Sequence, residues 1–398
     1  MNLWLRLFLP FAAGYFFSYF LRNANAIIAP ELTRELGLSA ADLGALTGAY
    51  LATFAAAQLP LGIALDRFGP RRVEGTLLLL AAAGCALFAV AAGLPGLALA
   101  RALIGLGVSA CLMGSFATFA RWFPAERQPS LNGAVMAFGA AGALSASQPL
   151  LWLVEQLGWR GMFGAFAGVG LLLALGIFST PEKPVPGSGA SLRAQIREIG
   201  GIATSRAYWV FAPQATFMIG GFMALQSLWA VPFMLEADGL VREVAAVHLL
   251  RSALGMLIGF IAIAFLAAPI ERRMPLERVL AIGVGLAVAA QAGIVAGFDR
   301  HGLLWLLLGI CYGASNLSYA LLQRRFPLHL AGRVNTTLNL LAFAGAFFIQ
   351  WGYGLAIDVL LAGGSTPAAA HRLVMGGLTA LMAAGWAWYA ANVRRLAS

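Results

Sequence analysis

One arginine, Arg22, lies inside the first long apolar segment of the chain and has the chemistry to bind an anion. Tyr15, Ser18 and Tyr19 precede it by seven, four and three residues, and Asn25 follows it by three. Residues at these spacings share one face of an α-helix and form a polar stripe on it. A guanidinium donates two parallel hydrogen bonds to a carboxylate or a phosphate. We therefore expect Arg22, Tyr15, Tyr19 and Asn25 to contact an anionic ligand; the alternative is that Arg22 extends to the outer lipid headgroups.

Arg101 is a second arginine within an apolar segment. Ionisable residues inside such segments are costly and mark functional sites. Together with Arg22 it would make a strongly positive pocket in the first half of the chain, so we include it among the ligand-binding residues. The alternative is that Arg101 braces neighbouring helices by hydrogen bonding to their backbone.

The second half of the chain offers neutral polar side chains at helical spacing instead of charges. Some of them are expected to make hydrogen bonds between helices, and others to contact the rest of the ligand. With one residue from the first half, the candidates are Gln148, Gln226, Asn316, Tyr319 and Asn339.

Acidic and thiol groups are placed where catalysis is not expected. Asp66 and Glu74 fall at the edge of apolar segments, so a carboxylate proton relay is not predicted. Exchange of anions and proton symport through an edge residue both remain open. The sequence shows no candidate nucleophile, set of metal ligands or acid–base pair, so we expect no enzyme activity, no cofactor and no metal. Cys85, Cys111 and Cys311 fall in apolar segments and are expected to pack there.

The composition is that of an integral membrane protein, with 61% hydrophobic and 11% charged residues. A soluble domain is nearer half apolar and a quarter charged. Helices of about 20 apolar residues span a bilayer. We expect twelve spans, at residues 5–28, 41–65, 73–93, 95–121, 130–155, 158–179, 207–235, 245–269, 276–298, 302–323, 334–361 and 370–393.

The net charge of +10 follows the predicted topology and does not predict binding to nucleic acid. Lys and Arg concentrate in cytoplasmic loops of membrane proteins. Here they concentrate in the N-terminus, the even-numbered turns and the C-terminus, so both termini are expected in the cytoplasm of a bacterial inner-membrane protein. Of 26 such residues these regions hold Arg6, Arg67, Arg71, Arg72, Arg121, Arg127, Lys183, Arg193, Arg197, Arg206, Arg272, Arg273, Arg278, Arg324, Arg325, Arg333, Arg394 and Arg395.

The two halves of the chain repeat each other at an offset of about 203 residues. Phe123–Pro124 recurs as Phe326–Pro327, and Glu155 corresponds to Asp358. An offset of six spans keeps the orientation in the membrane, so the repeats are parallel. We predict an all-α membrane protein in which twelve transmembrane helices form two six-helix bundles.

Local patterns place the boundaries of these bundles. We expect the N-terminal bundle at 1–179, a cytoplasmic linker at 180–206 and the C-terminal bundle at 207–398. Apolar residues at helical spacing in the linker predict a short amphipathic helix on the membrane surface. Ser39 and Asp42 predict a capping box at the start of the second span.

A charged turn between the second and third spans has a demanding residue pattern. Gly62, Asp66, Arg67, Gly69, Arg71 and Arg72 follow the order Gly-x-x-x-Asp-Arg-x-Gly-x-Arg-Arg. This turn resembles the signature loop of the major facilitator superfamily of secondary transporters. The resemblance implies the two-bundle fold and a gating role for these six residues, with Asp66 facing the start of the eleventh span.

The first span also resembles a branch of that superfamily. Gly14-Tyr15-x-x-x-Tyr19-x-x-Arg22 through Pro30 is similar to the first helix of organophosphate:phosphate antiporters and related organic-anion transporters. In these proteins an arginine at the place of Arg22 binds the anionic group of the substrate. They carry a second arginine on the seventh helix, where this chain has residues 218–224 without a charge, which argues against a symmetric clamp.

These features predict a secondary active transporter that moves a small anionic organic solute by alternating access, with substrate bound between the bundles. We further expect that a proton or a counter-anion is coupled to transport, that the protein is embedded in the lipid bilayer, and that it is a monomer. The first alternative is an exporter of drugs or siderophore-like compounds, although the fifth span lacks the Gly-Pro pattern that resembles drug:proton antiporters. The second alternative is a transporter-like receptor or biogenesis factor.

Overall fold

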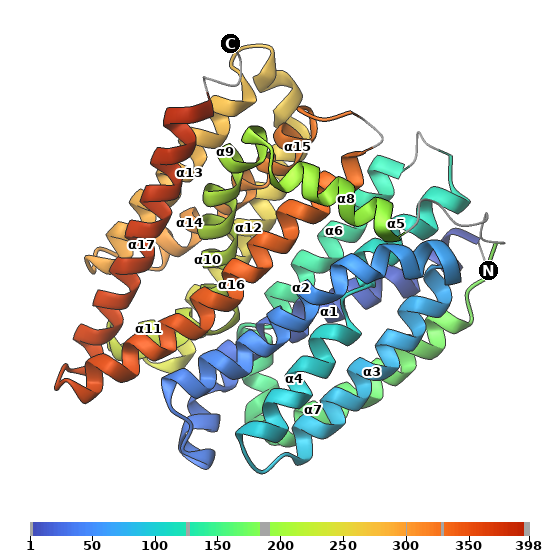
Figure 1. Ribbon diagram of the computed structural model, residues 1–398. Helices are drawn as coiled ribbons and strands as arrows, with labels where there is room; N and C mark the ends of the chain where they lie inside the picture. Colours follow the sequence, from blue (N-terminus) through green and yellow to red (C-terminus); the bar gives the residue numbers. More distant parts are fainter. Residues whose placement is uncertain (1–2, 125–127, 184–191, 300, 328–329, 394–398) are drawn as a thin grey trace. The chain divides into compact units, whose positions relative to one another are not determined.

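The computed structural model describes residues 3–124, 128–183, 192–299, 301–327 and 330–393, and their regular structure is helical (Figure 1). In chain order the helices are α1 (Leu3–Leu36), α2 (Ala40–Phe68), α3 (Pro70–Val90), α4 (Leu94–Gly107), α5 (Cys111–Trp122), α6 (Gln128–Ser145), α7 (Gln148–Phe178), α8 (Leu192–Ala203), α9 (Arg206–Gln214), α10 (Gly221–Ala224), α11 (Ala230–Glu236), α12 (Arg242–Glu271), α13 (Leu276–Val295), α14 (Leu303–Ser315), α15 (Leu317–Gln323), α16 (Ala331–Ala362) and α17 (Pro367–Asn392).

The helices account for the twelve predicted spans. Ten helical stretches in the described part of the chain are long and apolar enough to cross a membrane. The first span is α1, which carries several charges, and the fifth is α6 together with the start of α7. Gly158 has a left-handed φ of 66° and divides α7 into the end of the fifth span and the sixth span. The fold class predicted from the sequence is therefore confirmed.

The chain divides into two compact units. The first holds residues 1–38 and 45–191, and the second holds residues 39–44 and 192–398. The helix α8, which lies in the predicted linker at 180–206, is grouped with the second unit and packs on α16. Residues 192–203 are helical as the amphipathic pattern predicts.

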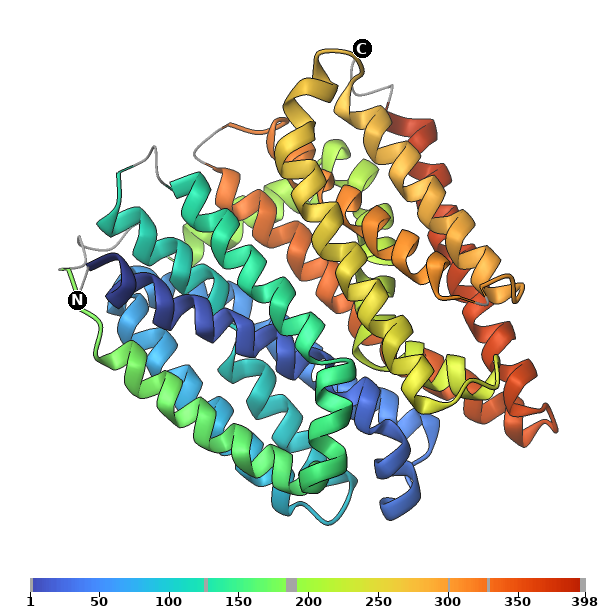
Figure 2. The same cartoon turned by 180° about the vertical axis from the view of Figure 1, so that it is seen from behind.

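The same helix pairs recur in both units, which is the structural form of the sequence repeat. In the first unit α1 packs along α6, and α3 packs along α4 and α7. In the second, α16 packs on the seventh span, while α13 packs along α14 and α17 (Figure 2). The pairs are in each case the first span with the fifth, and the third with the fourth and sixth.

Small residues allow the closest helix contacts in each unit. In the second unit, Gly255 and Gly259 of α12 face Gly309 and Gly313 of α14 with backbone against backbone. Such contacts drive helix association in lipid, where the hydrophobic effect between helices is absent. In the first unit, a Cβ at Gly105 of α4 would overlap the Tyr50 carbonyl of α2. Close approach of these two helices positions the arginine site described below.

The first turn of α2 is capped twice. The Ser39 hydroxyl accepts from the Asp42 amide at 3.1 Å and the Asp42 carboxylate accepts from the Ser39 amide at 3.0 Å, which confirms the predicted capping box. The Asp358 carboxylate of α16 accepts from the amides of Ala40 and Ala41 at 3.1 and 2.9 Å. A negative charge at a helix N-terminus also complements the helix dipole. These bonds explain why residues 39–44 group with the second unit.

Candidate functional site

The polar stripe on α1 turns into the interior of the first unit. Tyr15, Ser18, Arg22 and Asn25 are buried and Tyr19 is half-buried. The Tyr15 and Tyr19 rings meet edge to face with centroids 5.2 Å apart. Gly139 of α6 makes room for both rings, since a Cβ there would overlap Tyr15. The structure thus brings together the tyrosines and the arginine that were predicted from spacing.

Arg22 lies in an aromatic enclosure with 6% of its surface exposed. Its Cζ is 4.4 Å from the centroid of the Tyr19 ring and 5.1 Å from that of Phe54. The guanidinium also hydrogen bonds to the Tyr50 hydroxyl, which itself donates to the Ser18 carbonyl at 3.3 Å. Cation–π contacts stabilise the charge through the ring faces and do not use N–H donors. The enclosure fixes the planar group in one orientation.

Arg101 lies beside this enclosure and is fully buried. Its Nη1 donates to the Leu21 carbonyl of α1 at 2.8 Å, and its Cζ is 4.9 Å from the centroid of the Tyr50 ring. Nε and Nη2 have no hydrogen-bond partner in the described protein. Tyr50 therefore contacts both arginines, one through its ring and the other through its hydroxyl. The bond to Leu21 is the bracing contact that the sequence left as an alternative for Arg101.

Two other predicted residues of the first unit, Asn25 and Gln148, make no hydrogen bond to the residues that enclose Arg22 in the described structure. Asn25 donates from Nδ2 to the Thr47 hydroxyl at 2.9 Å and so joins α1 to α2. Gln148 is the first residue of α7, directly after the helix break that interrupts the fifth span. Its Oε1 is buried and has no hydrogen-bond partner among the described residues. Asn25 has a clear structural role, and Gln148 presents a polar atom that packing leaves unsatisfied.

In the second unit, two predicted residues bond to each other. The Tyr319 hydroxyl of α15 donates to Oδ1 of Asn339 in α16 at 3.0 Å. Asn316 stands at the break between α14 and α15, where its side chain donates to the Tyr312 carbonyl at 3.1 Å. All of Asn316, Tyr319 and Asn339 are half-buried. The pair Tyr319–Asn339 presents one hydroxyl and one amide from neighbouring helices.

Gln226 lies in an unusual part of the seventh span. Residues Ala215–Gly220 and Leu225–Trp229 form π-helical turns, which are rare and concentrate at functional sites. The Gln226 side chain is 5% exposed, and its Nε2 has no hydrogen-bond partner in the described structure. Trp229 donates from its indole to the Gln350 carbonyl of α16 at 3.0 Å. The π turns thus hold a buried, unsatisfied amide in the middle of a span.

The charged turn is built by glycine geometry and ion pairing. Gly69 has φ 81° and ψ 154° at the start of α3, a conformation that side chains rarely adopt. Arg71 and Arg72 approach the Glu182 carboxylate at 4.0 and 3.5 Å. Arg67 extends over the Phe68 ring, and Gly62 is exposed. The side chain of Asp66 lies outside the described structure, so its predicted gating contact is not addressed.

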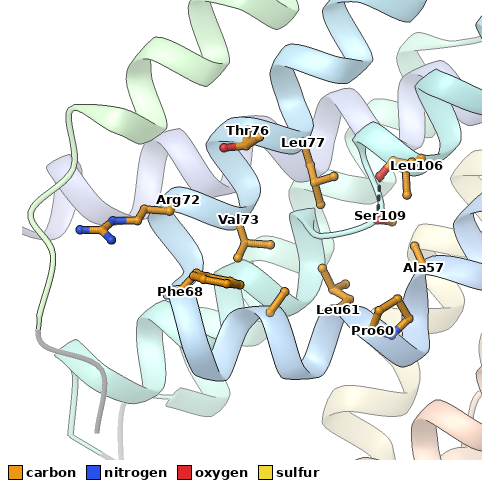
Figure 3. A pocket seen from close by; sticks show the side chains of 11 residues that line it. Ala57, Pro60, Leu61, Phe68, Arg72, Val73, Thr76, Leu77, Leu106 and Ser109 are labelled. Carbon is orange, nitrogen blue, oxygen red and sulfur yellow. Dashed lines mark hydrogen bonds between the residues drawn. The ribbon is translucent and has the colours of Figure 1, made fainter. Parts of the chain in front are cut away.

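An apolar groove of about 450 Å³ runs beneath this turn, between α2, α3 and the end of α4 (Figure 3). Arg72 is the one charged residue in its lining, and its guanidinium points away from the apolar side chains. The Ser109 hydroxyl donates to the Leu106 carbonyl at 2.7 Å. A groove of this character suits hydrocarbon and not an organic anion.

The sequence did not indicate Tyr50 and Phe54 as partners of Arg22. They lie on the second span, and helical periodicity does not show which face of α2 turns towards α1. A signal was present in the sequence, because Tyr50 is the one tyrosine of that span. Within the described residues there is no group of three or more His, Cys, Asp or Glu side chains that could hold a metal.

Comparison with known sequences identifies relatives of this chain. The sequence profile of the Major Facilitator Superfamily matches residues 11–350. A probable sulfoacetate transporter of Cupriavidus necator is 27% identical over 187 residues, which are 47% of this chain and 43% of that protein. A probable L-galactonate transporter of Escherichia coli is 29% identical over 159 residues, 40% of this chain and 35% of that protein. The aligned regions thus span less than half of these relatives.

Comparison with solved structures shows the same architecture over nearly the whole chain. A bacterial homologue of the human lysosomal transporter Spinster, in an inward-facing and unoccupied conformation, has a TM-score of 0.77 at 18% identity. It covers 98% of this chain and 96% of its own. The nucleoside transporter NupG has a TM-score of 0.76 at 14% identity, over 98% of this chain and 99% of its own.

Proposed function

This chain belongs to the Major Facilitator Superfamily, and we propose that it is a secondary active transporter of a small organic anion whose anionic group binds to Arg22. Superfamily membership confirms the expectation from the charged turn, and it classes the chain with transporters and not with enzymes. The choice of an organic anion is a proposal for this chain.

The observation that carries the proposal is the enclosure of Arg22. A guanidinium held deep in a span by the rings of Tyr19 and Phe54 keeps its charge in a poorly hydrated place. There its planar fork forms hydrogen bonds to a carboxylate, sulfonate or phosphate that are stronger than those between neutral groups. Arg101 adds a second buried positive charge next to Tyr50. The two positive charges make the local electrostatic potential more positive, which attracts an anion.

The named activities of the relatives point to the same class of substrate. They are described as probable transporters of sulfoacetate, of L-galactonate, and of galactarate or D-glucarate. All of these compounds are organic acids. We propose that the neutral residues of the second unit, Gln226, Asn316, Tyr319 and Asn339, recognise the uncharged part of such a molecule, and that Gln148 and Tyr15 assist Arg22.

The remaining features of the proposal follow from the family and the charge pattern. The protein is a multi-pass membrane protein. We propose that it lies in the inner membrane with both termini in the cytoplasm, acts as a monomer and works by alternating access through rocking of its repeats. The turn from Gly62 to Arg72 is then part of the cytoplasmic gate.

The test is counterflow of radiolabelled galactonate, sulfoacetate and glucarate in proteoliposomes with the variant Arg22→Gln. Truncating one partner of a buried hydrogen-bonded charge pair costs about 2–5 kcal/mol, so we expect a loss of affinity of at least about 30-fold. Arg22→Lys keeps the charge without the fork and should be impaired to a smaller degree.

Arg160→Gln is the matched control. Arg160 also packs on an aromatic ring, with Cζ 4.0 Å from the Trp159 centroid, and it donates to a backbone carbonyl, that of Ala91. It lies in the same unit and should leave counterflow unchanged. Wild-type rates from a well-folded Arg22→Gln protein would reject Arg22 as the anion site. Failure of the wild-type protein to exchange any of the three acids would reject this substrate class and favour the exporter alternative.

A further inference from the structure

Glu74 is buried inside the first unit, although its place near the start of a span predicted an edge position. It is the fifth residue of α3 and has no exposed surface. Its carboxyl fits between two glycines of neighbouring helices. A Cβ at Gly14 of α1 would lie 2.8 Å from Oε1, and a Cβ at Gly114 of α5 would overlap Oε2. The missing side chains at these two positions form the space that the carboxyl fills.

Neither oxygen of Glu74 has a hydrogen-bond partner in the described protein. An ionised carboxylate without partners in an apolar interior is so costly that the group takes up a proton instead. Even the neutral acid loses its hydrogen bonds to water, and an apolar side chain of similar size would be more stable there. The packing around Glu74 therefore gives no structural reason for an acid at this position.

The charged and titratable groups around Glu74 are few. From α5, the Cys111 thiol lies within electrostatic reach of Glu74 and also of Arg22. From α1, Arg22 follows Gly14 by eight residues, about 12 Å along the helix axis. From α7, the apolar ring of Phe178 packs on the neighbouring Gly75. On α3 itself, Arg71 and Arg72 are engaged with Glu182. Also on α1, Arg6 precedes Gly14 by eight residues but is exposed. From α5, Arg121 follows Gly114 by seven residues and donates to the Leu65 carbonyl. From α4, Arg101 lies near Cys85, which follows Glu74 by eleven residues, about 16 Å along the axis of α3. Of the two arginines of the binding site, Arg22 is therefore the nearer one.

We propose that Glu74 is a proton-binding site that couples a proton to the anion bound at Arg22, so that the two cross the membrane together. This inference rests on the proposed function. A hydronium ion gives its proton to a carboxylate oxygen of Glu74 on one side, and water accepts that proton on the other; no further reactant is required. Exchange with water requires α1, α3 and α5 to separate at Gly14 and Gly114, because the carboxyl is enclosed in the present conformation.

Electrostatics predicts that proton binding at Glu74 and anion binding at Arg22 favour each other. The positive charge of Arg22 favours ionised Glu74, and an anion on Arg22 cancels that influence and favours protonated Glu74. By reciprocity, a proton on Glu74 strengthens anion binding. Taking the axial distance from Gly14 to Arg22, about 12 Å, as the separation of the two charges, and an effective dielectric constant of about 20, the coupling corresponds to about a tenfold change in affinity. Anion affinity should therefore rise by up to about tenfold as the pH falls through the titration of Glu74.

The experiment separates exchange from accumulation in proteoliposomes, with radiolabelled galactonate, sulfoacetate and glucarate as probes. Glu74→Gln keeps the size of the side chain and removes the proton site. We expect it to retain counterflow within about twofold, to lose accumulation driven by a pH gradient, and to lose the pH dependence of affinity. Glu155→Gln, an exposed acid of the same unit, is the matched control and should accumulate substrate normally.

Accumulation by Glu74→Gln to the wild-type level overturns the proposal, and so does loss of counterflow in a folded variant. The infrared carbonyl band of a protonated carboxylic acid gives a second measurement. It should be present in the wild-type protein at neutral pH, and its absence also overturns the proposal. If Glu74→Gln does not fold, Glu74→Asp should shift this band and the pH dependence of affinity, and unchanged values count against Glu74. Absence of counterflow by the wild-type protein is a different result, because it rejects the anion substrates themselves.

Discussion

Arg101 tests whether charge alone attracts the anion to the positive pocket. Two roles are considered for this residue, electrostatic attraction of the anion and a hydrogen bond that braces α1, and they predict different results. If Arg101 acts on the anion through its charge, Arg101→Met should weaken binding and leave the fold intact. Arg22 and Arg101 contact the hydroxyl and the ring of the same tyrosine, Tyr50. At a separation of about 10 Å and an effective dielectric constant of about 20, a unit charge on the substrate gains about 1.7 kcal/mol from Arg101. The expected loss of affinity is about 20-fold.

The stability of the same variant should change little. Arg101→Met gives up the bond to the Leu21 carbonyl, but it also removes a buried charge, and replacing buried ionic groups by apolar ones of similar volume is often neutral. Arg101→Lys keeps the charge and should bind within about threefold of wild type, since the Coulomb contribution depends on charge and distance. Isothermal titration with sulfoacetate and galactonate measures affinity, and thermal unfolding of the purified protein measures stability.

Two outcomes would refute the electrostatic reasoning for Arg101. Wild-type affinity in Arg101→Met would show that the bond to Leu21 is its whole role. Equal weakness of Arg101→Lys and Arg101→Met in folded protein would show that the guanidinium fork, and not the charge, is required.

Two further predictions concern the turn and the second unit. Gly69→Ala should lower the free energy of unfolding by about 1–3 kcal/mol, because φ 81° and ψ 154° suit glycine alone. The control is Gly62→Ala, whose Cβ would meet nothing within 4 Å. Equal thermal stability of the two variants would contradict the argument that the backbone at Gly69 is strained for other residues. Tyr319→Phe removes the hydrogen bond to Asn339 and should reduce stability by about 0.5–1.5 kcal/mol. The same change should weaken binding of galactonate, which carries hydroxyl groups, more than binding of sulfoacetate, which has none; equal losses in titration of both acids would remove Tyr319 from substrate recognition.

The predicted site residues differ in how the structure uses them. Arg22, Tyr15 and Tyr19 were found from spacing on one helix, and the structure keeps them together because they share a face of α1. Asn25 shares that face as well, but its amide bonds to Thr47 of α2. The partners Tyr50 and Phe54 come from another helix, and the rotation of α2 about its axis depends on contacts such as Gly105 against the Tyr50 carbonyl. No periodicity in α1 contains that information.

The sequence by itself determined the twelve spans, the parallel repeat, the capping box and the superfamily. Each of these depends on local terms: the transfer of apolar residues into lipid, turn geometry, and residue patterns that recur along one chain. Only the tertiary structure decided that Arg101 donates to the Leu21 carbonyl and that Tyr50 contacts both arginines. Only the structure showed that Glu74, four residues from a helix start, is enclosed by Gly14 and Gly114. A side chain near the end of a span is exposed or buried according to which residues of neighbouring helices leave room for it, and that is a property of packing between segments far apart in the chain.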